Sequence, residues 1–126
     1  MANNLMDLGF IALAEARFDD ARPFVRESLA ICRADRLGDF LLWAVEAASA
    51  AAVSGAPEDA VRLLAATTKT REELAMDAGF YPIAEEIRER TLEQARAQLS
   101  ESAFAAAWAE GDALSLEEAA EQAARI

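Results

Sequence analysis

This chain of 126 residues contains no histidine, one cysteine and one lysine. Without histidine, a single copy cannot form a Ser-His-Asp or Cys-His catalytic centre or a metal site built on imidazole. The single Cys32 excludes an internal disulfide and a cysteine zinc site, and we expect it to be a small buried hydrophobic residue. The chemistry left open to such a chain is that of carboxylates.

Long hydrophobic runs are absent as well. No apolar segment approaches the roughly 20 residues that cross a bilayer, and residues 1–4 lack the basic start of a secretory signal. We therefore expect a soluble protein of the reducing cytoplasm that makes no membrane contact. The formal net charge of −11 would repel phosphate backbones, so we expect no direct nucleic-acid binding by this chain.

Glycine and proline are scarce, at five and three residues, whereas alanine occupies 32 positions. Alanine has the highest intrinsic helix propensity, and its small side chain lets helices approach closely. Apolar residues recur at three- and four-residue spacing, and no segment shows the alternation of a strand. The sequence predicts one all-α domain over residues 1–126 with about seven helices.

Caps and breakers predict where these helices begin and end. Ser100 and the capping box Ser115 to Glu118 open the last two helices, while Gly55 suits a left-handed C-terminal cap and Gly111 ends the sixth helix. On the first helix, Leu5, Leu8 and Ala12 have the spacing of one buried face. The expected helices cover about residues 4–16, 19–32, 40–53, 58–78, 82–99, 101–110 and 116–125.

Residues 8–25 and 47–64 repeat one helical-hairpin pattern. In each copy an apolar helix ends at a short turn, and the next helix opens with two acidic residues followed by Ala21 or Ala60. These alanines are 39 residues apart, whereas tetratricopeptide repeats have a period of about 34 residues. Leu8-Gly9 and the Ala21 to Val25 spacing resemble a tetratricopeptide repeat. The resemblance implies antiparallel hairpins in a short right-handed solenoid with a C-terminal capping helix, and a degenerate third hairpin over residues 82–110.

A second resemblance lies in the later part of the chain. Residues 55–64, 103–111 and 114–119, taken in order, look like the C-terminal end of large bacterial signal-transduction ATPases, including LuxR-type transcriptional regulators. The resemblance implies a sensor or interaction arm that is part of, or related to, a longer regulator. The chain itself contains no Gly-x4-Gly-Lys-Ser/Thr loop and no basic recognition helix.

The tetratricopeptide-like pattern implies a concave face made by the first helix of each hairpin. Clamps for a peptide carboxylate use lysine, arginine and asparagine, and Asn3 alone qualifies there. An apolar groove instead favours an apolar helix, an upstream repeat or a second copy as its occupant, so a homodimer is one expectation. The predicted interaction residues of this groove are Met6, Phe10, Leu13, Leu42 and Val45, with Ser49 beside them.

Our leading interpretation is a non-catalytic protein-interaction or regulatory module that needs no cofactor and no metal. A small-molecule sensor is the alternative, with a pocket between hairpins. An enzyme would have to use two carboxylates across one cleft, whereas the sequence places acids on outer faces only. The pocket of the alternative interpretation would be lined by Met6, Phe10, Trp43 and Val45.

Two further clusters have a structural explanation beside a functional one. The acidic set Glu85, Glu86, Glu89 and Glu93 could bind a cation or a basic partner, but pairs with Arg88 and Arg90 favour a solvated helix face. The aromatic residues could stack a flat ligand, but we expect them to pack between hairpins. If Trp108 is a core residue, its truncation to alanine should cost about 3–5 kcal/mol. The aromatic set is Trp43, Phe80, Tyr81, Phe104 and Trp108.

Overall fold

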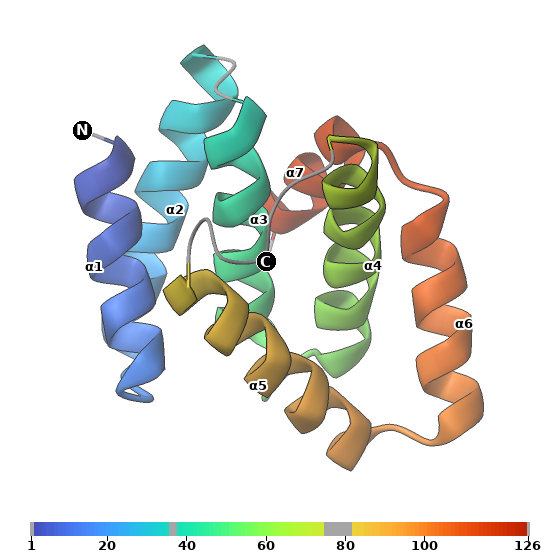
Figure 1. The fold of residues 1–126 in the computed structure, drawn as a ribbon. Coiled ribbons are helices and arrows are strands. Elements are labelled where there is room, and N and C mark those ends of the chain that lie inside the picture. The colour runs from blue at the N-terminus through green and yellow to red at the C-terminus, as the bar shows by residue number, and fades with distance from the viewer. Residues whose placement is uncertain (1, 36–37, 75–81, 126) are drawn as a thin grey trace.

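The computed structural model describes residues 2–35, 38–74 and 82–125 (Figure 1). Within these ranges the protein is all-α, with seven helices and no strand, which confirms the predicted fold class. The helices are α1 (Ala2–Ala14), α2 (Phe18–Asp35), α3 (Gly38–Ala52), α4 (Pro57–Glu73), α5 (Pro82–Gln98), α6 (Glu101–Asp112) and α7 (Leu116–Arg125). The end predicted for the fourth helix near residue 78 lies outside the described residues.

The first four helices lie side by side in chain order (Figure 1). α1 packs against α2, α2 against α3 and α3 against α4, so each helix is next to its successor as the two predicted hairpins require. The right-handed solenoid remains a prediction. α3 is the central helix, because every residue from 41 to 53 is buried.

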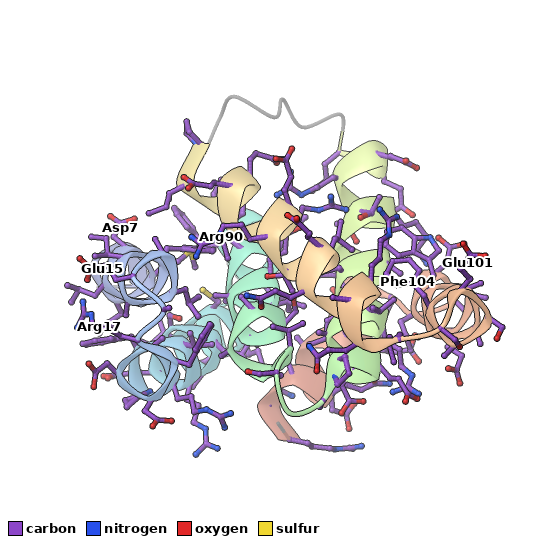
Figure 2. All side chains as sticks on the ribbon, turned by 90° about the horizontal axis from the view of Figure 1, so that it is seen from below. Asp7, Glu15, Arg17, Arg90, Glu101 and Phe104 are labelled. Carbon is purple, nitrogen blue, oxygen red and sulfur yellow. The ribbon has the colours of Figure 1, made fainter. Side chains whose placement is uncertain are left out.

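The remaining helices cover this layer instead of extending it by another hairpin. α5 crosses over α1, α3 and α4, whereas α7 packs against α2, α3 and α4 on the opposite face (Figures 1 and 2). α6 packs along α4 and meets α5 only weakly. The predicted third hairpin over residues 82–110 is therefore wrong, because the apolar stripe of α5 is buried on the four-helix layer and not on α6.

Two of the predicted caps are confirmed. The backbone N–H of Ala103 donates to Ser100 Oγ at 3.1 Å. In the capping box, the N–H of Glu118 donates to Ser115 Oγ at 3.1 Å and the N–H of Ser115 donates to Glu118 Oε1 at 2.9 Å. These hydrogen bonds satisfy N–H groups that have no partner within the helix.

The predicted left-handed conformation at Gly55 is wrong, and the predicted end of the sixth helix at Gly111 is one residue early. Gly55 does not adopt the left-handed conformation, since none of the described glycines has a positive φ. α6 continues through Gly111 to Asp112. A Cβ at Gly111 would lie 2.1 Å from the carbonyl oxygen of Arg62 on α4. Gly111 is therefore required for the close approach of two helices and not for chain termination.

Within the described ranges, the non-glycine residue with a left-handed backbone is Ala16, between α1 and α2, with φ of 58°. The N–H of Arg17 donates to the carbonyl of Ala12 at 2.8 Å, and the N–H of Ala16 donates to that of Leu13 at 3.0 Å. These two bonds form a Schellman motif, which usually places glycine at the residue with positive φ. Alanine there adds local strain.

Side chains from neighbouring helices satisfy carbonyl groups at several helix C-termini. Arg90 of α5 donates to the carbonyl of Ala14 at the end of α1, at 3.2 Å, and Figure 2 shows Arg90 on the side of α5 toward α1. Lys69 of α4 donates to the carbonyl of Asp112 at 2.8 Å. Cations near the negative end of a helix are favourable, so these contacts hold α5 on α1 and α6 on α4.

Candidate functional site

The residues predicted for an apolar groove lie in the core. Met6, Phe10, Leu13, Leu42 and Val45 are all buried, with exposed fractions of at most 2%. They belong to one cluster with Ala84 and Ile87 of α5, so this chain covers the surface that the sequence left open for a partner. The buried Ser49 lies on the same helix as Leu42 and Val45, and Asn3 is a residue whose side chain is not described.

The exposed apolar face of α1 differs from the expected one. Leu8, predicted to face inward, is 47% exposed, and Ile11 is 45% exposed. The inward face instead carries Met6, Phe10 and Leu13. The two stripes have the same helical spacing, so spacing alone did not distinguish them.

A buried carboxylate lies beneath α5. The side chain of Glu46 on α3 is only 1% exposed. Arg71 of α4 donates from Nε to Glu46 Oε2 at 2.9 Å and from Nη2 to Oε1 at 2.7 Å. Such a bidentate pair compensates for the removal of both charges from water. The expectation that acids lie on outer faces only is wrong at Glu46.

α5 completes this ion network. Arg71 also pairs with Glu85, and Arg88 lies with Nε 3.5 Å from Glu46 Oε2 while its Nη2 donates to Thr68 Oγ1. Burial lowers the pKa of Arg88, and the neighbouring carboxylate of Glu46 opposes that shift. Arginine nevertheless stays charged in proteins. The network of Glu46, Arg71, Glu85 and Arg88 therefore fastens α5 to α3 and α4.

The predicted pairs within α5 are replaced by contacts to other helices. Glu85 pairs with Arg71, and Arg90 donates to the Ala14 carbonyl. The rest of the acidic set, Glu86, Glu89 and Glu93, is exposed. Among the described residues there is no group of three or more His, Cys, Asp or Glu side chains placed to hold a metal ion.

An open cleft separates α5 from α6, because the two helices diverge from their connection while both contact α4. The cleft has a volume of about 600 Å³. A smaller cavity of about 330 Å³ continues beyond Arg96 and Phe104, which line both. The cleft is lined by Arg88, Leu92 and Arg96 of α5 and by Phe104, Ala105, Trp108, Ala109 and Asp112 of α6.

Two partly buried aromatic rings form one wall of this cleft. The rings of Phe104 and Trp108 lie nearly parallel, with centroids 6.1 Å apart and 14° between their planes. Both also pack against the small apolar cluster around Val61. Figure 2 shows Phe104 on the side of α6 that faces α4 and α5. Trp108 is thus not a fully buried core residue, and part of its ring is available for contact.

The other predicted aromatic residues have different positions. Trp43 is buried, and its ring meets that of Phe40 edge to face at a centroid distance of 5.9 Å. Trp43 therefore packs as expected and does not line an open pocket between hairpins. Phe80 and Tyr81 lie outside the described residues.

The side chains of the cleft follow a four-residue spacing on both helices. Arg88, Leu92 and Arg96 form one stripe of α5, separate from the buried stripe that includes Ala84 and Ile87. Phe104 and Trp108 form the facing stripe of α6. Both stripes can be recognised in the sequence, but it does not show that the two helices diverge enough to leave space between them.

The chain matches no protein-family model, no curated protein and no solved structure. None of the described helices is both long enough and apolar enough to cross a bilayer.

Proposed function

We propose that this domain is a non-catalytic protein-interaction and regulatory module that binds a segment of a partner protein between α5 and α6. The observation that carries the proposal is the open cleft of about 600 Å³, whose wall combines Leu92, Phe104 and Trp108 with charged residues at its edges. Interaction surfaces are commonly built from aromatic and arginine side chains around an apolar centre.

The shape of the cleft favours a helical segment as its occupant. Its two walls are helices, and α6 has 12 residues, which corresponds to a length of about 18 Å. A helix that places apolar side chains at three- and four-residue spacing fits such a groove. Contacts within the protein position both walls, α5 through the buried ion network and α6 through the close contact of Gly111 with Arg62.

A regulatory role rests on the resemblance to the C-terminal arms of bacterial transcriptional regulators and on the place of α5. This helix forms one wall of the cleft and also covers the core residues of α1 and α3. A partner that binds one orientation of α5 better than another would bias the packing of the first four helices.

The arrangement of the helices favours the alternative function, small-molecule sensing, less than it favours binding of a protein segment. The pocket predicted between hairpins is filled by Met6, Phe10, Trp43 and Val45 themselves, which are all buried. The volume of the α5–α6 cleft lies within the range of ligand sites, but those sites enclose most of their ligand. A cleft that is open to solvent suits an extended partner better than an enclosed small molecule.

The test is a phage-displayed library of helical peptides about 12 residues long, a length matched to one wall of the cleft. Ala105 and Ala106 are adjacent exposed residues of α6, of which Ala105 lines the cleft and Ala106 does not. Selected peptides should lose binding to Ala105→Glu and keep it with Ala106→Glu, the matched control. Failure to select any peptide, or equal binding to both variants, would refute the proposed function.

A further inference from the structure

Building on the proposed function, we propose that the cleft selects partner segments that carry a carboxylate beside their apolar side chains, and that Arg96 recognises this carboxylate. The partner is therefore an acidic amphipathic helix. The two cations of the cleft, Arg88 and Arg96, differ in whether they are already paired within the protein.

Arg96 is an exposed residue of α5 whose guanidinium carbon lies 4.8 Å from the centroid of the Phe104 ring. A guanidinium carries five N–H donors, more than a contact with one ring can occupy. Among the described residues, Arg96 contacts this ring and pairs with no carboxylate. The ring therefore holds a cation in place with its donors available to a partner.

Arg88, the other cation of the cleft, is committed within the protein. Its guanidinium contacts Thr68 Oγ1 and lies 3.5 Å from Glu46 Oε2, and its side chain is only 15% exposed. Its charge is balanced by the buried carboxylate. Of the two described cations that line the cleft, Arg96 is therefore the one available to a partner.

Charged residues lie at both ends of the cleft. Arg96 lies near the connection between α5 and α6, where the exposed Glu101 lines the continuing cavity with it, whereas Asp112 is the last residue of α6. Between them, Leu92, Phe104 and Trp108 supply the apolar surface. A complementary helix places its carboxylate at the Arg96 end and its apolar side chains over the two rings. The chain as a whole is acidic, so this local contact acts on orientation and specificity more than on the rate of encounter.

The experiment uses peptides selected from the library and measures their affinity by fluorescence anisotropy. Each peptide is compared with a matched form in which the carboxylate is changed from Glu to Gln. The protein variants are Arg96→Gln and, as the control, Arg33→Gln, which removes the same charge from an exposed position on α2. Circular dichroism confirms that all variants are folded.

We expect the wild-type domain to bind the Glu peptide about threefold to fivefold more tightly than the Gln peptide, the upper part of the range for a partly exposed ion pair. Arg96→Gln should abolish this preference while keeping the affinity for the Gln peptide. Arg33→Gln should behave as the wild type.

Four results would overturn the inference. Equal binding of both peptides by the wild-type domain, or a preference that survives in Arg96→Gln, would refute the role of Arg96 while leaving a cleft-dependent interaction intact. Self-association that Ala105→Glu abolishes would show that a second copy of the chain occupies the cleft. Binding that Ala105→Glu leaves unchanged would refute the proposed function itself.

Discussion

At the scale of single residues, Ala16 combines a favourable turn with an unfavourable backbone conformation. Its φ of 58° costs an L-residue about 1 kcal/mol or more. Glycine would remove that cost but lose about 0.4–1 kcal/mol through the entropy of the unfolded chain. We expect Ala16→Gly to raise the free energy of unfolding by about 0.5 kcal/mol, measured by urea denaturation.

The control for this prediction is Ala30→Gly on the exposed face of α2. At an ordinary helical position the same change should cost about 1 kcal/mol. Equal losses at both positions would show that Ala16 does not have the left-handed conformation.

Glu118 provides a prediction about pH. Hydrogen bonds from the Ser115 backbone and hydroxyl hold the pKa of Glu118 below its ordinary value. A carboxylate whose pKa is lowered by folding adds stability above its unfolded pKa of about 4.3. That contribution is lost as the pH falls through the lower folded pKa. An NMR titration should show this lowered pKa in the wild type. Ser115→Ala should return it only part of the way, because alanine keeps the backbone N–H that is the larger cause. An ordinary pKa of Glu118 in the wild type would contradict the capping box.

At the scale of helices, Gly111 decides how closely α6 lies on α4. An alanine inside a helix is normally favoured over glycine by about 1 kcal/mol. Here its Cβ would overlap the backbone of Arg62, so Gly111→Ala should cost about 1–3 kcal/mol in thermal or urea unfolding. Gly55→Ala is the control, because no atom lies within 4 Å of the added Cβ. A stabilised Gly111→Ala variant would mean that the two helices are farther apart.

The buried ion network is the second prediction at this scale. Arg71→Ala leaves Glu46 buried without its bidentate partner, and we expect a loss of about 3–5 kcal/mol in the free energy of unfolding. Arg125→Ala, at an exposed pair with Glu121, should change it by less than about 1 kcal/mol. Adding both Glu46→Leu and Arg88→Met to Arg71→Ala should recover part of the loss, because neither Glu46 nor Arg88 is then left as a buried charge without its partner. No recovery would show that packing of Arg71, and not its charge, stabilises the fold.

At the scale of the whole molecule, α5 covers the apolar surface through which the sequence predicted that two copies could associate. The groove that the sequence left for a second copy is filled by this chain's own residues, including Ala84 and Ile87. The large exposed apolar residues that remain on α1 are Leu8 and Ile11, and single exposed apolar residues are ordinary on protein surfaces. We expect light scattering after chromatography to give the monomer mass of 13.6 kDa over a series of concentrations.

A dimer would contradict this prediction. Leu8→Glu should then dissociate the dimer if Leu8 and Ile11 of α1 form the interface, whereas Ala105→Glu should dissociate it if the cleft is the interface. The two variants therefore distinguish the two surfaces.

Much of the local structure could be predicted from the sequence. Ser100 and Ser115 cap helices where expected, because capping depends on residues within one turn. The sequence showed that α1 buries an apolar stripe, but it did not show which side of the helix carries that stripe, since Leu8 proved exposed and Phe10 buried. The role of Gly111 was not predictable, because it depends on the Arg62 backbone, 49 positions away in the chain.

The sequence by itself determined that this protein is helical and where most of its helices begin, because helix propensity and capping act over a few residues. Only the tertiary structure decided that α5 covers the predicted groove, that Glu46 is buried with Arg71, and that α5 and α6 diverge to form a cleft. These features depend on which of several similar apolar stripes meet, and that choice is made by packing among distant segments.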